Sequence, residues 1–482
     1  MSSEAPTAQL DQPSAERRRQ LLPGWLTDRQ GSWPFLLVLC IVVFGVSLWQ
    51  TGDELHTTRF HPDESRWINR AHYINDLTDP TGDAWADRYL TRGQPPMGSY
   101  MIGLGLLLQG RDVTTNGPWN FQYGDEYNVN WNSITGNMPS RADLEAARRF
   151  NAVLGALTCV FIFLIVTRLT NWVGGLAGGF FMAINPLQIT LSSQALADAS
   201  LVFIIGLTAL AAMALAERPS WPRAFLLGVL LGFGASAKLS PLLLAVGLGG
   251  IGLLLLFNRW IRQLPYLGKA WALVARGDDA VIHRLAWMLL ALPAITYTTF
   301  VLSYPYLWPD PVARTKYLFD FRQYEMANQA RLWNDRAVDS RIDAMRRVWA
   351  AFENHYTSSG RVVNLTGRII GAGWGQVGID GIFELAGIIL FIGLALRHGI
   401  ISRHFMALAV LGGQTALIIA GMRVDFNRYY LPILLFLAVS VGILAGEVWS
   451  LLPHFLPVRV RSRQRDRAST VVSGRWPATT GQ

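Results

Sequence analysis

Charged side chains of complementary types stand beside several long apolar segments of the sequence. They are His61-Pro62-Asp63-Glu64, Asp198, Lys238 and Arg428. A carboxylate can accept the proton of an attacking hydroxyl, and a cationic side chain can stabilise a phosphate that departs with growing negative charge. A divalent ion held by carboxylates is a second way to stabilise that charge. These residue types therefore suit a reaction in which a hydroxyl displaces a phosphate.

The composition indicates where such a site must be held. Of the 482 residues, 51% are apolar and only 16% are charged, whereas a soluble domain carries roughly a quarter charged residues. Apolar runs recur along the whole chain, which excludes a set of soluble domains and predicts an all-α polytopic membrane protein. Cys40 and Cys159 both lie inside apolar runs, so neither a disulfide nor a metal site is expected from them. The net charge of +9 is typical of cytoplasmic flanks that meet anionic lipid, and no nucleic-acid partner is expected.

Ten segments are apolar enough to be predicted as membrane spans, since a helix needs roughly 20 such residues to cross the hydrocarbon core. They are 33–50, 148–167, 172–191, 195–216, 223–238, 240–257, 285–303, 381–396, 404–421 and 430–451. Segment 96–109 is apolar but short, which is more typical of an interfacial helix. If it spanned, the later basic loops would move to the outside, against the positive-inside rule. We therefore expect ten spans, or eleven with that segment, and both termini in the cytoplasm.

This topology divides the chain into five parts. Basic tails at 1–32 and 453–482 are expected in the cytosol. An N-terminal transmembrane module, 33–303, contains a first external loop at 52–147, and further transmembrane helices occupy 381–452. The remaining part, 304–380, is expected to be an external loop rich in aromatic residues that covers the sugar or the acceptor; an ordinary interfacial aromatic belt is the alternative. Its candidate residues are Tyr304, Tyr306, Trp308, Arg322, Tyr324, Trp333, Asn334 and Trp349.

Each charged candidate also has an ordinary structural interpretation. Pro62 followed by two acids is typical of a helix start. Asp198 could bond to a neighbouring helix, Lys238 could reach lipid head groups, and Arg428 could anchor its helix at the interface. Under the predicted topology, however, all of them meet at the external face. Because lipid-linked sugar phosphates bring an anomeric carbon and a phosphate leaving group to that depth, the set favours glycosyl transfer there.

The same residues lie in stretches that resemble GT-C glycosyltransferases using polyprenyl-phosphate sugars. The most similar group is that of protein O-mannosyltransferases and lipid A aminoarabinose transferases, and the likeness runs over about 40–450. The stretches that carry it, in order, are Phe60–Glu64, Gly93–Met97, Ala147–Ala152 leading to Val166–Leu169, Ala195–Asp198, Gly228–Leu239 and Arg428–Pro432. The resemblance implies a GT-C-like bundle of ten or eleven transmembrane helices, with interfacial helices in the first external loop.

The resemblance also implies roles for single residues. Asp63 is similar to the catalytic base of the family, and Glu64 to the second member of its acid pair. Asp198 resembles a further external acid that positions the acceptor or a metal, and Lys238 resembles a lysine that contacts phosphate. One departure is Gln94, where relatives often have lysine before two prolines.

Gln94 cannot neutralise a phosphate, so another group must do so. Arg92 is the candidate substitute, together with Arg428. A divalent metal ion is the alternative, with Asp63, Glu64, His61 and Asp198 as candidate ligands.

These observations predict an inverting glycosyltransferase of the cytoplasmic membrane, with its active site on the outer face. It would take a sugar from a polyprenyl-phosphate donor, and Asp63 would act as general base toward the hydroxyl of an acceptor protein, lipid or glycan. A transporter or lipid flippase without covalent chemistry is the alternative, although such proteins often show repeated halves, which this sequence lacks. An inactive relative that serves as a partner subunit is a third hypothesis.

Overall fold

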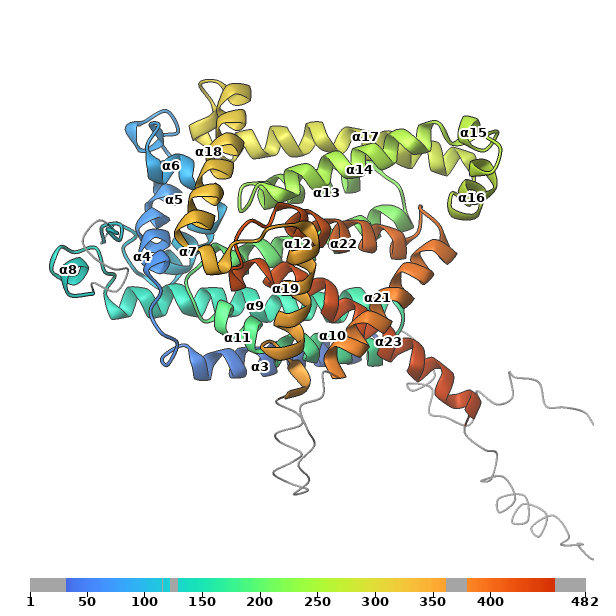
Figure 1. Ribbon diagram of the computed structural model, residues 1–482, viewed down its shortest axis with the longest axis horizontal. Helices are drawn as coiled ribbons and strands as arrows, with labels where there is room; N and C mark the ends of the chain where they lie inside the picture. Colours follow the sequence, from blue (N-terminus) through green and yellow to red (C-terminus); the bar gives the residue numbers. More distant parts are fainter. Residues whose placement is uncertain (1–31, 115, 122–128, 361–378, 456–482) are drawn as a thin grey trace, which may run out of the picture.

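The computed structural model describes residues 32–114, 116–121, 129–360 and 379–455. Within these ranges the secondary structure is helical apart from one isolated antiparallel bridge between Ala337 and Val424. The predicted all-α class is therefore confirmed (Figure 1). The predicted cytosolic tails, 1–32 and 453–482, fall almost entirely outside the described residues.

Seven of the described helices are long and apolar enough to cross a membrane. They are α3 (Trp33–Glu54), α9 (Arg141–Leu169), α12 (Ala197–Glu217), α17 (Asp279–Leu302), α21 (Ile379–His398), α22 (Arg403–Gly421) and α23 (Leu431–Phe455). Four shorter apolar helices accompany them: α7 (Met97–Leu108), α10 (Trp172–Ala183), α13 (Trp221–Ala235) and α14 (Ser240–Leu256). Each of the ten predicted spans thus overlaps one of these helices, and the eleventh helix, α7, is the predicted interfacial segment.

The predicted span 172–191 is wrong in one respect, because it consists of two helices. α10 ends at Ala183, and α11 (Pro186–Ser192) begins three residues later. Asn185 is extended, with φ −69° and ψ 129°, and its side chain caps the N–H of Leu187. Pro186 has no N–H and fits only the first turn of a new helix. The Asn-Pro pair therefore ends one helix and starts the next.

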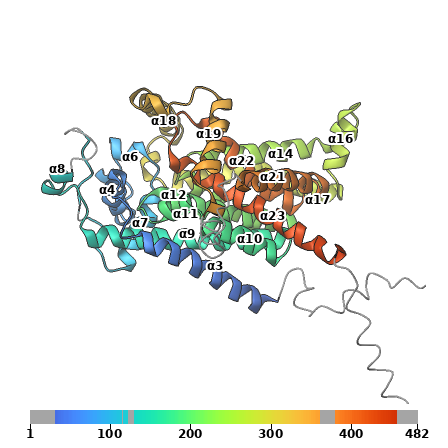
Figure 2. The same ribbon diagram turned by 60° about the horizontal axis from the view of Figure 1, so that its bottom comes forward.

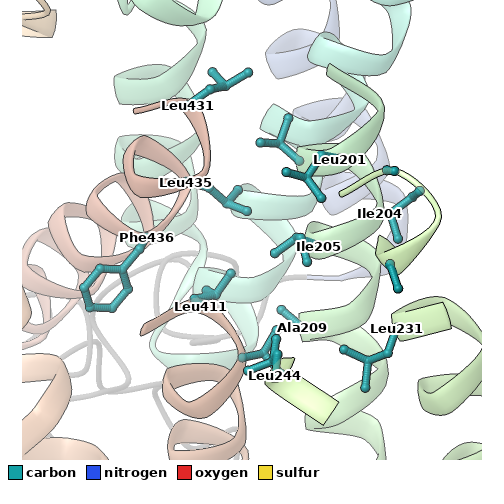
Figure 3. Packing of buried hydrophobic residues seen from close by; sticks show 14 of the residues in the cluster. Leu201, Ile204, Ile205, Ala209, Leu231, Leu244, Leu411, Leu431, Leu435 and Phe436 are labelled. Atoms are coloured by element: carbon teal, nitrogen blue, oxygen red, sulfur yellow. The ribbon is translucent and has the colours of Figure 1, made fainter. Parts of the chain in front are cut away.

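Helix α12 lies at the centre of the bundle. Its residues are apolar on all sides, which is typical of a helix surrounded by other helices. Figure 3 shows Leu201, Ile204, Ile205 and Ala209 of α12 packed among side chains from α13, α14, α22 and α23. All four are at most 5% exposed. The core thus holds the N-terminal end of α12, where Asp198 lies, in a fixed place.

The remaining helices gather at the two ends of the bundle (Figures 1 and 2). One end carries α4 (Pro62–Asn69), η1 (Arg70–His72), α5 (Tyr73–Asp76), η2 (Asp83–Trp85), α6 (Tyr89–Gly93), α8 (Val129–Ile134), η3 (Pro305–Leu307) and α18 (Pro311–Leu332). The opposite end carries α15 (Asn258–Ile261) and α16 (Leu267–Val274). Helices α18 and α19 (Arg341–Asn354) run across the direction of the long helices, and η4 (Asn334–Arg336) joins them. Most of the described first polar segment and helix α18 of the second therefore lie toward one end of the molecule, whereas α19 lies over its middle (Figure 1).

Candidate active site

Asp63 stands in the first turn of α4, and the residues around it explain why a helix begins there. His61 is extended, and its Nδ1 accepts a hydrogen bond from the N–H of Asp63 at 3.1 Å. The N–H of His61 in turn donates to Oε2 of Glu64 at 2.9 Å. This reciprocal capping box, with Pro62 in the first helical position, fixes the start of the helix. The interpretation of Pro62 and the two acids as a helix start is therefore correct. The same capping contacts fix the backbone from which the Asp63 side chain projects.

Glu64 is fully buried and points into the protein, away from Asp63. Its oxygens accept bonds from Arg148 Nε at 2.8 Å and Nη2 at 2.7 Å, and Oε1 also accepts the N–H of Ala195 at 2.8 Å. Arg148 Nη1 donates to the carbonyls of Leu55 and Thr58. This bidentate pair joins α4, α9 and the segment before α12. Glu64 therefore positions the elements that carry Asp63 and Asp198.

Asp63 pairs with Arg428, which lies 365 positions later in the chain. Nη1 of Arg428 donates to Oδ2 of Asp63 at 2.8 Å. Desolvation alone would raise the pKa of Asp63, but the electrostatic influence of Arg428, with smaller contributions from His61 and Arg66, outweighs it, so the pKa lies below its ordinary value of 3.8. For Arg428, desolvation is outweighed by Asp63, and its pKa is raised. Asp63 is therefore held ionised, as a base requires.

Asp198 and Lys238 form a second ion pair beside the first. Nζ of Lys238 lies 2.5 Å from Oδ1 of Asp198. Asp198 stands in the first turn of α12, and Lys238 occupies the short connection between α13 and α14. The N–H of Met97 donates to the carbonyl of Ser236 at 2.8 Å, which attaches the start of α7 to that connection.

A cavity of about 280 Å³ brings both pairs together. Its wall contains Asp63, Asp198, Lys238, Arg428 and Arg92, so five of the six predicted site residues meet there, and Glu64 does not line it. The charged lining residues are six cations (Arg66, Arg70, Arg92, Lys238, Arg322 and Arg428) and three carboxylates (Asp63, Asp198 and Glu325). Six positive charges against three negative ones leave a net charge of +3. The cavity is therefore electrostatically suited to an anionic ligand such as a phosphate.

Tyr429 lies among three of these cations. Nη2 of Arg322 donates to its hydroxyl at 3.2 Å, and Nζ of Lys238 lies 5.4 Å from the centre of its ring. Desolvation raises the pKa of Tyr429, but Arg322, Arg428 and Lys238 together outweigh it and lower the pKa. Tyr429 therefore interacts with cations from α18, the connection before α14 and its own element, η5 (Asn427–Tyr429).

Arg92 and Gln94 lie on the wall that α6 contributes. Nη1 of Arg92 bonds Oδ1 of Asp87 at 3.2 Å, and its guanidinium stands 5.4 Å from the centre of the Phe321 ring. The carbonyl of Gln94 accepts a bond from Arg70. Arg92 therefore supplies positive charge near the position where the sequence has Gln94.

The four residues predicted as alternative metal ligands do not fit that role. Among the described residues, no three His, Cys, Asp or Glu side chains gather in a way that could hold a metal ion. The Asp63, Asp198 and Glu64 carboxylates are each bonded to a cationic side chain, and His61 caps α4 with Nδ1. In this structure these four side chains are therefore engaged by protein partners rather than gathered around one point.

The aromatic-rich segment that is predicted to be external contributes mainly through α18. Of the eight residues named for it from the sequence, Arg322 lines the cavity. Tyr304 and Tyr306 are buried beneath the wall, and the Tyr304 hydroxyl donates to the carbonyl of Thr91. Glu325 and Gln329 of α18 also line the cavity, although no sequence motif indicated either residue. Their spacing places Glu325 and Gln329 on the same face of a helix as Arg322. It predicts that they line the cavity only once that face is known to pack against it.

Residues 85–304 match the model of the dolichyl-phosphate-mannose-protein mannosyltransferase family. The resemblance to these glycosyltransferases that the motifs predicted is thereby confirmed for this segment, which contains Arg92, Asp198 and Lys238. No curated protein sequence matches the chain.

Several solved structures are partly similar to the chain. One is the Archaeoglobus fulgidus oligosaccharyltransferase tethered with an acceptor peptide, with 12% identity, 89% of this chain and 51% of that chain covered, and a TM-score of 0.45. A second is ArnT from Cupriavidus metallidurans bound to undecaprenyl phosphate, with 17% identity and a TM-score of 0.44. That match covers 85% of this chain and 59% of the ArnT chain. A third is the S. cerevisiae Pmt1-Pmt2 protein O-mannosyltransferase complex bound to the sugar donor, with 18% identity and a TM-score of 0.37. That match covers 58% of this chain and 35% of that chain. The similarity thus extends over about a third to three fifths of these longer chains.

Proposed function

We propose that this protein is an inverting membrane glycosyltransferase. It would move a sugar from a polyprenyl-phosphate donor to the hydroxyl of an acceptor, at the outer face of the cytoplasmic membrane. The observation that carries the proposal is the cavity in which Asp63 and Asp198 lie beside Lys238, Arg92 and Arg428, with an excess of positive charge. The family match over 85–304 supports the same chemistry.

The proposed reaction is a single displacement at the anomeric carbon. The acceptor oxygen forms a bond to that carbon while the bond between the carbon and the phosphate oxygen breaks. The electron pair of the broken bond leaves with the polyprenyl phosphate. The proton of the acceptor hydroxyl passes to the Asp63 carboxylate. Because the acceptor attacks from the side opposite the phosphate, the configuration at that carbon is inverted.

The cations of the cavity would stabilise the leaving phosphate. Lys238, Arg428 and Arg92 lie on its wall and need not move far to bind it. A phosphate that takes over Arg428 would also weaken its bond to Asp63 and so raise the proton affinity of that carboxylate when the base is needed. Asp198 would hold Lys238 in place, and Glu64 would act through Arg148 as a positioning residue.

Replacing Asp63 with asparagine tests the proposed base. Asp63→Asn keeps the size of the side chain but removes its proton affinity, so we expect transfer from dolichyl-phosphate mannose to fall at least about 100-fold, in line with general-base catalysis. Asp83→Asn, at an exposed carboxylate of the same external segment, is the matched control and should keep full activity. A fully active Asp63→Asn protein would remove this residue from the mechanism.

A further inference from the structure

Helix α18 presents one continuous face to the cavity. The six lining residues that it contributes are Leu318, Phe321, Arg322, Glu325, Met326 and Gln329. Their spacing of three and four residues puts them on the same side of a helix. Asp320 lies on the other side, where its exposed carboxylate bonds Lys316 at 2.7 Å. The cavity-facing side thus combines apolar groups with one cation, one carboxylate and one amide.

Two polar groups on this face lack protein partners. Asp63 and Asp198 are each paired with a cation, whereas Glu325 makes neither an ion pair nor a side-chain hydrogen bond with any residue that the structure describes. Oε1 of Gln329 is buried, and it too has no hydrogen-bond partner. Glu325 is half-buried, so the cost of a buried acceptor without a donor falls on Gln329. Sites that bind polar ligands are where such groups persist. Both atoms are acceptors, so the missing partners are hydrogen-bond donors.

The position of these groups along α18 indicates what supplies the donors. Arg322 is tied to Tyr429, where it joins Lys238 and Arg428 at the cationic corner of the cavity. Glu325 lies three residues and Gln329 seven residues further along the helix, which correspond to about 4.5 Å and about 10 Å of rise. A sugar ring bonded directly to a phosphate in that corner spans a similar distance. Its hydroxyls are donors at the required places.

We infer that Glu325 and Gln329 form a sugar subsite, in which they accept hydrogen bonds from hydroxyls of the donor sugar. This inference rests on the proposed function, because it takes the phosphate of the same donor to occupy the corner beside Arg322 and Lys238. The ligand class is a neutral sugar on a lipid phosphate, since a carboxylate and an amide oxygen can each accept hydroxyl donors. Phe321 and Met326 supply the apolar surface beside them.

Equilibrium binding to the full chain in lipid nanodiscs tests this subsite with two probes, dolichyl-phosphate mannose and dolichyl phosphate. The wild-type protein should bind the mannose-bearing lipid more tightly. Glu325→Gln should weaken binding of that lipid about tenfold, the size of one hydrogen bond to a charged group. It should not weaken binding of dolichyl phosphate, because it removes a negative charge from the cavity. Gln329→Leu should act in the same direction. Asp320→Asn, on the opposite side of α18, is the matched control and should change neither affinity.

The possible failures are distinguishable. If Glu325→Gln and Gln329→Leu weaken both lipids equally, or leave the mannose-bearing lipid unaffected, the sugar subsite is refuted while the phosphate site stands. If they alter only the KM for the acceptor, the face binds acceptor and the subsite for the donor sugar is likewise refuted. If the wild-type protein binds neither lipid, the proposed function itself fails, and the subsite fails with it.

Discussion

Asp63 is subject to opposing influences on its proton affinity. Desolvation raises its pKa, whereas the guanidinium of Arg428 and the nearby His61 and Arg66 lower it by a larger amount. Under the proposed mechanism Asp63 must be ionised to accept a proton, so its lowered pKa should preserve activity as the pH falls. Activity should be lost only below the ordinary aspartate value of 3.8.

Removing Arg428 should therefore shift the pH dependence in a defined direction. In Arg428→Gln, the guanidinium that opposes the desolvation of Asp63 is lost, so the pKa of Asp63 rises. The acid limb of the kcat/KM profile should then move to higher pH. The profile of kcat/KM reports groups of the free enzyme, which is the state described here. Arg149→Gln, an exposed arginine on α9, is the control and should leave the limb in place. An unshifted limb in Arg428→Gln would mean that a group other than Asp63 controls it.

The pairing of Glu64 with Arg148 leads to a different expectation from that for Asp63. In Glu64→Gln, an amide NH₂ would face the donors of Arg148 and leave a buried charge unpaired, which costs about 3–5 kcal/mol. We expect a clearly lower midpoint of thermal unfolding, followed by tryptophan fluorescence in detergent. Asp63→Asn, at the partly exposed neighbour, should stay close to the wild-type midpoint.

A surface carboxylate of α9 provides the control for this comparison. Glu145 pairs with Arg141 and Arg149 at the surface. Glu145→Gln should leave the midpoint nearly unchanged, since exposed ion pairs contribute little. A Glu64→Gln protein as stable as the wild type would show that this buried pair does not hold the site together.

For single residues, the sequence indicated which charged side chains belong to the candidate site. It did not indicate the direction in which each side chain points. Asp63 and Glu64 are neighbours, and nothing local distinguishes the one that faces the cavity from the one that binds Arg148. That distinction depends on where α9 packs, 84 positions away from Glu64. For the same reason, Glu325 and Gln329 could not be assigned to the cavity before the docking of α18 was known.

Among the helices, the closest approach of α10 and α23 depends on glycine. A Cβ added to Gly442 of α23 would lie 2.8 Å from the carbonyl oxygen of Gly174 and 3.1 Å from Cα of Gly178, both in α10. Small residues of this kind let helix backbones approach closely in membranes. The site depends on this contact indirectly, because α23 directly follows η5, which carries Arg428 and Tyr429.

Gly442→Ala should therefore push the two helices apart and lower the midpoint of thermal unfolding. Gly250 of α14 is a matched control, since a Cβ there would meet nothing within 4 Å. Gly250→Ala should be neutral or stabilising, because alanine has the higher helix propensity. Equal midpoints for the two variants would contradict the close packing of α10 on α23.

Hydrophobic runs predicted the existence of the helices well and their ends less well. The span 172–191 contains the signals that divide it, because Asn185 caps a helix and Pro186 begins one, but the continuous apolar run hid them. Helix α9 begins at Arg141, before the predicted start at 148, because its first two turns are polar and continue the helix outside the apolar run. Hydropathy thus finds the apolar part of a helix rather than its ends.

Over the whole molecule, the candidate site and the basic segment with α15 and α16 lie at opposite ends of one bundle. The elements that carry Asp63, Arg92, Arg322 and Arg428 meet at one end, and the basic segment with α15 and α16 lies at the other (Figure 2). The positive-inside rule assigns the α15–α16 end to the cytoplasm, so the cavity is expected to open on the outer face. A polyprenyl-phosphate donor embedded in that leaflet could then reach the cations while its lipid chain stays in the membrane.

The central claim is that this cavity breaks the bond between a sugar and a lipid phosphate. The most direct measurement uses purified protein in liposomes with dolichyl-phosphate mannose that carries separate labels on its sugar and its phosphate, together with a cell-envelope extract as the source of acceptor. We predict that the wild-type protein separates the two labels, leaving one in dolichyl phosphate and the other in a new product, and that Asp63→Asn does not. If the two labels always stay together, and the intact lipid only changes leaflet, the protein is a flippase and the account is wrong.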